Sequence, residues 1–483
     1  MTGIVLRRAE VEGRGPVDVR IAAGVIAEIG PQLPAQERDE IIDARGGALL
    51  PGLCDHHVHL HAMAAAVLSV QCGPPAVTGP AALAAALAAA DADRDGWVRG
   101  VGYSEDVAGL LDAAGLDRLH PGRPVRMQHR SGALWIVNTA GLHALGLAGP
   151  APPDHPGIER DGDSRPTGRL WRADDWLRAR LPPARPPGLR PIGSRLTRLG
   201  VTHVTDATPD LDDTAIAAII TAMASGDLPQ HVQLLGAPLN WTRPAGSRAP
   251  APGPYKIIIA DSELPDLASL TERISAAHAT GRAVAVHCVT REALVLLLAA
   301  LAHAGTRPGD RIEHAALVPA EVIPALRRSR LTVVSQPGFF SQRGDDYRRD
   351  VPAAEHADLY RAGSLLSSGV GYAVSSDAPY GPLDPWAVIA AATDRTAPSG
   401  NVIGPAERIT AHQALAGYLS RPDQPAGPVR PLAAGSPADL VLLTVPLAAA
   451  LAAPSSGVVA ATIIGGRVGA SPDGVLTPTN PAG

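Results

Sequence analysis

The sequence predicts an α/β fold, a TIM (β/α)8 barrel joined to a small β-sandwich domain that is built from both chain ends. Two observations lead to this prediction. Apolar, β-branched runs alternate with Ala- and Leu-rich helical stretches along the middle of the chain, as they do in parallel βα units. The length of 483 residues also suits one barrel of roughly 250 to 400 residues plus an accessory module.

The two ends of the chain carry the short, Gly-punctuated apolar runs of a small β domain. Strands are expected at 4–6, 17–21, 25–29, 40–43, 439–444 and 458–464. We predict that residues 1–50 and 429–469 form the two parts of the β-sandwich and that residues 51–428 form the barrel. Residues 470–483 are expected to be a flexible tail, because Pro and Gly are frequent there.

The barrel region contains more candidate strands than a barrel needs. They are 49–54, 97–102, 125–128, 202–205, 231–235, 255–260, 283–287, 311–314, 332–335 and 372–375. A barrel uses eight strands, so two of these belong to insertions, and periodicity cannot identify which two. Helices are expected at 81–92 and 291–304, which are rich in Ala and Leu and contain no Pro. The Pro- and Gly-rich stretch 149–168 is predicted to be a surface loop long enough to act as a lid.

Charge and hydropathy exclude several classes of partner. The net charge is -5 and the arginines are scattered, so the chain lacks the basic field that binds nucleic acid. The longest apolar stretch, 293–302, is far shorter than the ~20 residues needed to cross a bilayer, and the first residues lack the pattern of a signal peptide. We expect a cytoplasmic protein with a small-molecule substrate and no nucleic-acid or membrane partner; a homodimer stays open.

One compositional feature is sharper than these. The single lysine of the chain is Lys256, and every other basic side chain is arginine. Since arginine supplies charge equally well, position 256 is predicted to need a primary amine. Burial lowers a lysine pKa enough to give a neutral amine, which arginine cannot provide. The alternative is an ordinary salt bridge, for which arginine would serve.

An apolar run in the first candidate barrel strand ends in acid and imidazole, at Asp55, His57 and His59. Because side chains alternate along a strand, these three are expected on one side, where two histidines can share a metal ion. A His-x-His pair alone is as often structural as ligating. The sequence also places a histidine or an aspartate at the ends of three later apolar runs, at His287, His314 and Asp377. The carboxyl ends of barrel strands form the face where active sites lie.

These residues resemble a known family. Residues 42–60 are similar to the first-strand signature of the amidohydrolase superfamily, and residues 283–287, 311–315 and 374–378 match its strand-five, strand-six and strand-eight ligand positions in order. Other segments resemble the YtcJ-like branch, amidohydrolase family 3. These are 97–103, 124–142, 166–168 and 407–410.

The resemblance implies a site with two divalent metal ions. Its ligands would be His57, His59, Lys256, His287, His314 and Asp377. Lys256 would react with carbon dioxide, and the resulting carbamate would bridge the ions. Zn²⁺ is favoured, although imidazole and carboxylate ligands also suit nickel, manganese and iron.

The resemblance further implies hydrolysis of a non-peptide carbon–nitrogen bond of the amide type in a small molecule. A hydroxide shared by the metals would attack the carbonyl, with Asp377 as general base and then general acid. Two departures from the pattern of the branch leave the substrate open. Ala133 stands where histidine is frequent, and Arg172 stands where an acidic residue is usual.

Seven further residues near predicted strand ends are candidates for substrate binding. They are Tyr103, His129, Arg130, Trp135, Gln336, Phe339 and Tyr380. For each of them, ordinary packing or surface exposure explains the sequence at least as well.

Two other functions compete with this one. A mononuclear-metal deaminase on the same barrel typically has a glutamate three residues after the strand-five histidine, where this chain has Thr290. A metal-free scaffold on this barrel usually lacks one or more ligands, and here the sequence has all of them. The hydrolase is therefore the favoured interpretation.

Overall fold

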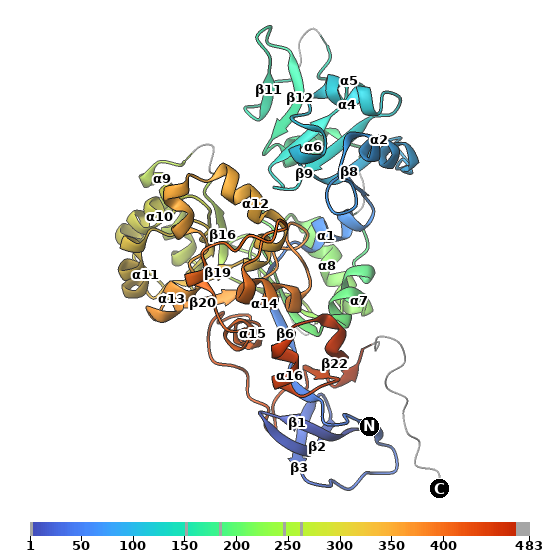
Figure 1. The fold of residues 1–483 in the computed structure, drawn as a ribbon, viewed down its shortest axis with the longest axis vertical. Helices are drawn as coiled ribbons and strands as arrows, with labels where there is room; N and C mark the ends of the chain where they lie inside the picture. The colour runs from blue at the N-terminus through green and yellow to red at the C-terminus, as the bar shows by residue number, and fades with distance from the viewer. Residues whose placement is uncertain (1–2, 150–152, 183–185, 245–247, 261–263, 470–483) are drawn as a thin grey trace. The chain divides into compact units, whose positions relative to one another are not determined.

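A computed structural model describes residues 3–149, 153–182, 186–244, 248–260 and 264–469. The chain divides into two compact units, the main unit of residues 1–60 and 188–483 and the inserted unit of residues 61–187. Both contain helices and strands, so the α/β class is confirmed (Figure 1). The predicted tail at 470–483 lies outside the described residues.

The main unit contains two parallel sheets, of order β15-β14-β13-β6 and β16-β17-β18-β19-β20. Their strands are β6 (Leu53–Val58), β13 (Val201–Asp206), β14 (His231–Leu234), β15 (Ala251–Pro252), β16 (Tyr255–Ile258), β17 (Val284–Cys288), β18 (Arg311–His314), β19 (Thr332–Ser335) and β20 (Gly371–Val374). Backbone hydrogen bonds connect the two sheets at both margins. Lys256 N donates to Leu235 O at 3.1 Å, and Asp377 N donates to His57 O at 2.9 Å.

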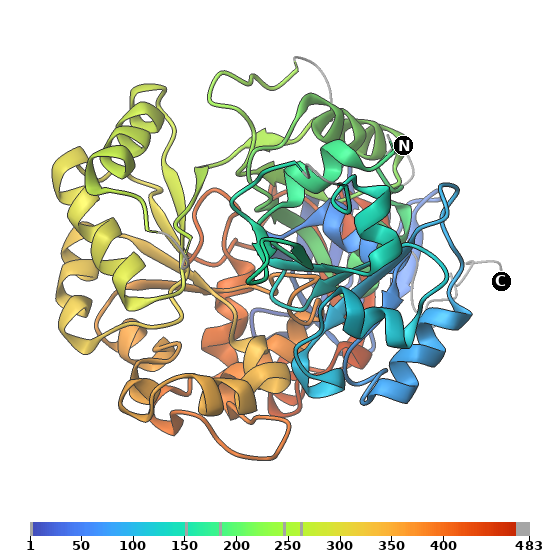
Figure 2. The same ribbon diagram turned by 90° about the horizontal axis from the view of Figure 1, so that it is seen from above.

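Helices follow most of these strands. They are α7 (Arg190–Arg198), α8 (Asp213–Ser225), α9 (Leu267–Ala279), α10 (Arg291–Ala304), α11 (Ile323–Ser329), α12 (Phe340–Asp350), α13 (Ala362–Ser367), α14 (Pro385–Asp394), α15 (Ala411–Leu419) and α16 (Leu447–Ala452). Figure 2 shows the yellow and orange helices on the outer side of the strands between them. The predicted helix at 291–304 is confirmed, and its buried side chains include Leu294, Leu297 and Leu301.

Both chain ends enter one eight-stranded sheet, of order β23-β22-β21-β5-β1-β2-β3, with β4 paired to β1. Its strands are β1 (Ile4–Val11), β2 (Arg14–Ala22), β3 (Val25–Gly30), β4 (Glu40–Asp43), β5 (Ala48–Pro51), β21 (Leu440–Leu443), β22 (Val459–Ile464) and β23 (Arg467–Val468). Leu49, Leu440 and Leu442 belong to its buried core. The predicted association of the two ends is therefore found, and the arrangement as a sandwich stays a prediction.

The predicted strand at 49–54 is in fact two strands. β5 pairs with β21 in the chain-end sheet, whereas β6 pairs with β13 in a parallel sheet. Gly52 separates them, and a Cβ at that position would lie 2.2 Å from the Thr202 Cγ2 atom. The chain thus changes sheets at a residue whose lack of a side chain permits a close approach.

The inserted unit contains a separate sheet of order β11-β12-β10-β9-β8-β7. Its elements are α1 (Leu60–Val67, which starts in the main unit), β7 (Val70–Gln71), α2 (Pro80–Ala89), β8 (Val98–Tyr103), α3 (Glu105–Ala108), α4 (Ala113–Leu119), β9 (Val125–His129), β10 (Leu134–Val137), α5 (Thr139–Ala144), β11 (Ile158–Arg160), β12 (Pro166–Trp171) and α6 (Asp174–Arg180). β8 and β9 are the two extra candidate strands. The other eight candidates lie in the parallel sheets of the main unit.

The prediction of a continuous loop at 149–168 was wrong, because β11 and the start of β12 form a hairpin there. The Asp161 side chain accepts hydrogen bonds from the backbone of Asp163 and Arg165, both at 2.9 Å. This local turn closes the hairpin despite the Pro and Gly content of the stretch.

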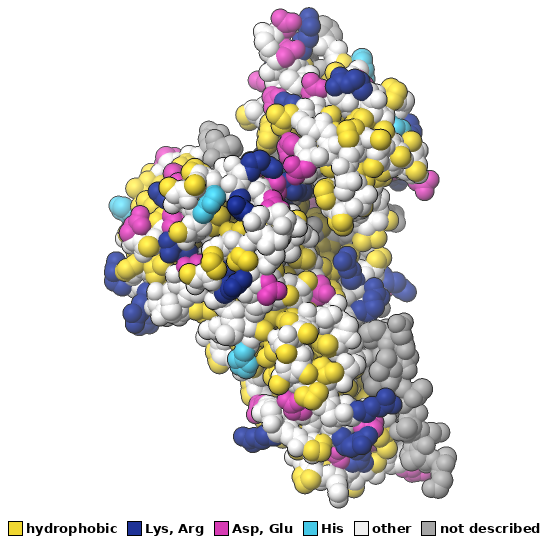
Figure 3. Space-filling model, viewed as in Figure 1, with side chains coloured by type: hydrophobic (Ala, Val, Ile, Leu, Met, Phe, Trp, Pro, Cys, Tyr) yellow, Lys and Arg dark blue, Asp and Glu magenta, His cyan; other side chains and the backbone are white. Residues whose placement is uncertain are grey.

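The hydropathy of the helices and the surface charge can be described for the residues that the structure covers. No helix among them is long and apolar enough to cross a membrane. In Figure 3, basic and acidic side chains are interspersed on the visible face. The thiols of Cys54, Cys72 and Cys288 are buried.

Candidate metal centre

The six predicted metal ligands all belong to the main unit, and five of them lie at or beyond the carboxyl ends of parallel strands. His57 is in β6 and His59 follows it, while His287 and His314 are at the ends of β17 and β18. Asp377 follows β20 after two residues. Lys256 is different, because it is the second residue of β16. These strand ends form one edge of the parallel sheets, which is where a barrel carries its active site.

Three of these residues form a buried cluster with metal-ligand spacing. One ligand atom from each of His57, His314 and Asp377 lies within 4.8 Å of the others. The Asp377 Oδ1 atom is 3.6 Å from His57 Nε2 and 3.2 Å from His59 Nε2. Imidazole nitrogen and carboxylate oxygen are the donors that zinc and other transition metals bind.

In three of the histidines, the Nδ1 atom contacts a side-chain oxygen of another residue. His57 Nδ1 lies against the Glu313 carboxylate. His59 Nδ1 is 3.1 Å from Thr208 Oγ1, and His314 Nδ1 is 2.8 Å from Gln336 Oε1. The Nε2 atoms of His57 and His59 are directed toward Asp377 instead. In metal sites such outer partners fix the tautomer and orientation of ligating histidines.

Glu313 is a functional candidate that the sequence reasoning missed. It is fully buried in β18, and its other oxygen, Oε1, accepts a hydrogen bond from Arg311 Nε at 2.5 Å. A buried carboxylate is rare unless it is paired. A glutamate in a strand predicted to be buried could therefore have indicated, from the sequence, a carboxylate that is paired inside the protein.

Lys256 lies inside this cluster. Its side chain is buried, and Nζ is 3.4 Å from His57 Nε2. Burial lowers the pKa of Lys256, although the nearby Glu313 and Asp377 carboxylates oppose the change. The amine is thus shifted toward the neutral form that carbamylation needs.

Asp377 is the acid at the centre of the cluster. Burial alone would raise its pKa, but the imidazoles of His57, His59 and His314 lower it well below the usual range. Its Oδ1 atom is buried, and its near neighbours include His59 Nε2 at 3.2 Å and His57 Nε2 at 3.6 Å. A buried, ionised oxygen that faces imidazole nitrogens fits a site for a divalent cation.

The backbone at two of the ligands adopts an unusual conformation. His314 has φ 72° and Asp377 has φ 55°, and Ala315 beside His314 has φ 49°. Residues other than glycine seldom adopt positive φ, and such positions cluster at functional sites. The fold therefore holds these two ligands in orientations that an ordinary strand end would not give.

The remaining main-unit residues singled out from the sequence are His287, Tyr380, Phe339 and Asp55. The His287 ring packs against the His314 ring with centroids 4.5 Å apart, and the Tyr380 ring lies 5.4 Å from the His59 ring. Phe339 is buried in an aromatic cluster. Asp55 does not join the ligand cluster, because its Oδ1 atom accepts the backbone N–H groups of His57 and Ser376, both at 3.2 Å.

The other four predicted substrate residues belong to the inserted unit and make polar contacts within it. Tyr103 Oη donates to Gly109 O at 2.5 Å, and Trp135 Nε1 donates to Asp174 Oδ1 at 2.8 Å. The structure also places His129 Nε2 3.1 Å from Glu105 Oε2, and Arg130 3.7 Å from Asp106. Their role in substrate binding stays a prediction.

Comparison with known proteins identifies similar sequences along nearly all of the chain. A family model described as "Amidohydrolase family" matches residues 40–470. The N-substituted formamide deformylase of Arthrobacter pascens is 26% identical over 473 residues, which cover 85% of this chain and 86% of that protein. YtcJ of Bacillus subtilis, named as an amidohydrolase, is 25% identical over 426 residues, which cover 77% of this chain and 79% of YtcJ.

Solved structures share the fold. The crystal structure of an uncharacterized metal-dependent hydrolase from Pyrococcus horikoshii has a TM-score of 0.71 and covers 92% of this chain and 97% of that one. The two sequences are 18% identical, so this likeness concerns the fold alone.

Proposed function

This chain belongs to the amidohydrolase family, and we propose that it is a metal-dependent enzyme that hydrolyses a non-peptide amide-type carbon–nitrogen bond in a small molecule. The observation that carries the proposal is the convergence of His57, His314 and Asp377, three buried ligand groups from separate strand ends. We also infer that eight of the nine strands in the two parallel sheets, all except the two-residue β15, close into one (β/α)8 barrel. The hydrogen bonds at both of their margins support this closure.

The proposed centre holds two divalent ions, with Zn²⁺ favoured. The ligands would be His57, His59, Lys256, His287, His314 and Asp377. When bound, the ions would lower the pKa of water toward neutrality and polarise the amide carbonyl. The buried Asp377 oxygen and the Nε2 atoms that face it support this donor set.

Asp377 is the proposed general base and acid. Its carboxylate is ionised because three imidazoles lower its pKa, so it can accept a proton from the attacking water. It then passes this proton to the leaving nitrogen, which departs as a neutral amine. The Nδ1 contacts of His57, His59 and His314 keep the reacting groups in place through both transfers.

Lys256 is proposed to be carbamylated. Burial shifts its amine toward the neutral form, and a neutral amine attacks carbon dioxide to give a carbamate and a proton. The product carries an anionic, carboxylate-like group in place of the neutral amine. Its oxygen atoms would be suitable ligands for divalent ions, which a protonated lysine would repel.

The deaminase alternative has no support at Thr290. The Thr290 side chain accepts a hydrogen bond from Ala293 N at 3.2 Å and caps α10, a structural task at the position where that alternative expects an acid. A metal-free scaffold would not need buried ligand groups with the donor pattern found here.

The proposal is tested by metal loading and a substrate screen. Purified protein should contain divalent metal, lose activity when a chelator removes it, and regain activity with Zn²⁺ or Mn²⁺. N-formyl and N-acyl amines and cyclic amides form the first panel, because one relative is a formamide deformylase. Substoichiometric metal after reconstitution, together with no hydrolysis of any member, would count against the proposal.

A further inference from the structure

We propose that the main unit carries a second metal site, formed by His203, His231 and Asp439, which binds a transition-metal ion such as Zn²⁺. It lies toward the amino ends of β13 and β14, whereas the candidate centre described above lies beyond carboxyl ends. The second site does not depend on the proposed function.

Strand register brings the two histidines together. His203 in β13 pairs directly with His231 in the neighbouring parallel strand β14. Paired residues on adjacent strands project to the same face of a sheet. The two rings are accordingly stacked, with centroids 4.6 Å apart and an interplanar angle of 27°.

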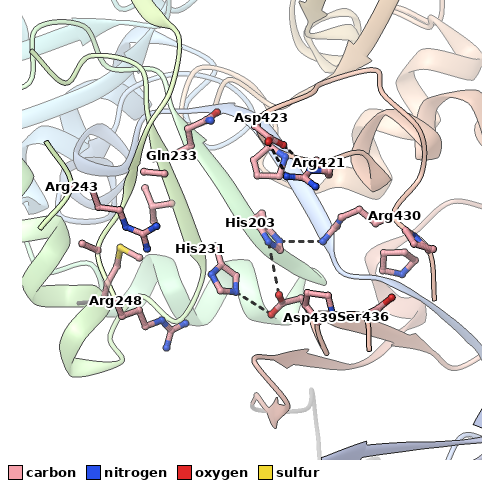
Figure 4. A pocket seen from close by; sticks show the side chains of 18 of the residues that line it. His203, His231, Gln233, Arg243, Arg248, Arg421, Asp423, Arg430, Ser436 and Asp439 are labelled. Atoms are coloured by element: carbon pink, nitrogen blue, oxygen red, sulfur yellow. Dashed lines mark hydrogen bonds and ion pairs between the residues drawn. The ribbon is translucent and has the colours of Figure 1, made fainter. Parts of the chain in front are cut away.

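Asp439 arrives from the other end of the chain, just before β21. Its backbone oxygen accepts from Gly52 N and its Oδ1 atom accepts from Gly465 N, both at 2.8 Å. The carboxylate is thus fixed on two sides before any ion binds. Figure 4 shows both imidazoles directed toward it.

The ligand atoms lie close enough that small side-chain rotations would bring all three to one metal ion. Asp439 Oδ1 lies 3.2 Å from His231 Nε2, and Asp439 Oδ2 lies 4.0 Å from His203 Nε2. One ligand atom from each of the three residues lies within 4.8 Å of the others. In a tetrahedral zinc site with bonds of about 2.0–2.1 Å, ligand atoms are ~3.3 Å apart.

The donor set favours a transition metal over Mg²⁺ or Ca²⁺, because two of the three donors are imidazole nitrogens. His203 also has an outer partner, since its Nδ1 atom lies 2.8 Å from Thr202 Oγ1. With Nε2 on the metal, Nδ1–H would donate to Thr202, whose hydroxyl donates to Leu53 O at 3.4 Å.

The charge of Asp439 supports cation binding. Asp439 is buried, and its Oδ1 atom accepts a hydrogen bond from Gly465 N at 2.8 Å and lies 3.2 Å from His231 Nε2. It supplies the anionic ligand that compensates part of the charge of a divalent ion.

Four arginines line a cavity beside the site, Arg243, Arg248, Arg421 and Arg430, and three of them have acceptors of their own. Arg248 donates to Pro229 O. Arg430 donates to Leu419 O and Gly52 O. It therefore needs no further acceptor at His203 Nδ1, 3.4 Å away, when that nitrogen carries its proton. Arg421 forms two hydrogen bonds with Asp423, both at 2.9 Å. Their remaining positive charge would favour an anion as the fourth metal ligand.

This cavity gives access to the site. Its volume is about 520 Å³, and His203, His231 and Asp439 line its wall. The His231 side chain is 44% exposed, whereas those of His203 and Asp439 are 13% and 7% exposed. An ion can therefore reach the ligands from solvent, and the cavity has room for the fourth ligand.

The test compares the Zn²⁺ content of wild type, His203→Gln and His231→Gln after loading and removal of free metal. The control is His278→Gln, because His278 pairs with Asp310 at 3.0 Å and belongs to neither group of candidate metal ligands found among the described residues. Each site variant should hold one ion fewer per chain than wild type and control. Equal content in all four folded proteins would overturn the proposal.

A spectroscopic measurement gives an independent readout. The three candidate ligands are neutral or anionic donors that would hold Co²⁺ with low symmetry. The wild-type minus His231→Gln difference spectrum of the Co²⁺-loaded proteins should show visible d–d bands. A flat difference spectrum would overturn the proposal, whether or not the enzyme hydrolyses amides.

Discussion

At the scale of single residues, the scarcity of lysine gained a physical explanation. Lys256 is buried beside His57, at a position where a permanent cation would face metal ligands. An uncharged amine avoids the repulsion between a cationic side chain and a bound metal ion. A carbamate would go further and carry a negative charge. The structure places Lys256 beside a candidate ligand, and the requirement for an amine at this position stays a prediction.

Replacement of the amine should abolish activity. Lys256→Arg is expected to lower kcat/KM at least about 100-fold, since loss of even an outer partner of a metal site costs 10–100-fold. Steady-state kinetics and metal analysis measure the effect, and circular dichroism checks the fold. Lys256→Ala should be partly rescued by a short carboxylic acid. Wild-type activity in Lys256→Arg would dispose of the carbamate.

Glu313 should tune the centre through His57. Glu313→Gln removes the charge that holds His57 Nδ1, so we expect metal affinity to fall about 10–100-fold with little change in secondary structure. Competition with a chromogenic chelator measures this affinity. Glu321→Gln is a control outside the ligand strands, and an equal loss in both variants would contradict a specific role for Glu313.

At the scale of elements, a helix cap and a glycine mark the starts of two segments, α10 and β6. α10 begins after Thr290, whose side chain bonds the third residue of the helix. Gly52 lets the chain change from the chain-end sheet to the first parallel strand. Thr290 acts locally, because it bonds the helix that directly follows it. Gly52 acts over a longer range, because it permits close approach to Thr202, 150 residues along the chain.

The cap at Thr290 should contribute to stability and little to chemistry. Thr290→Ala is expected to lower the free energy of unfolding by about 1 kcal/mol, whereas Thr290→Ser should retain the hydrogen bond. Urea denaturation measures both values. A large loss of kcat in a Thr290→Ala protein of unchanged metal content would instead assign the residue to the reaction.

At the scale of the whole molecule, the two chain ends meet in one sheet. β21 pairs with β5 through Leu440, Val441 and Leu442 opposite Pro51, Leu50 and Leu49. The final strands therefore cover an edge of β5, which leads directly into the strand that carries His57. Stability of this sheet should influence the position of the metal ligands.

Leu442 tests this connection because it is buried in the core of the chain-end sheet. Leu442→Ala should destabilise the protein by about 2–5 kcal/mol through lost burial and a residual cavity. Val429→Ala is the control, since Val429 is 45% exposed. Thermal unfolding compares the two variants, and equal melting temperatures would contradict the assigned packing.

The sequence by itself determined the α/β class, ten candidate strands without their division between sheets, and the order of the candidate ligand residues. These features depend on local alternation, capping and residue type, which are visible along the chain. Only the tertiary structure decided that the two extra strands belong to the inserted unit, that Glu313 holds His57, and that Asp439 meets His203 and His231. Those relations join residues that are up to 256 positions apart, as in the His57–Glu313 contact, and no local pattern records them.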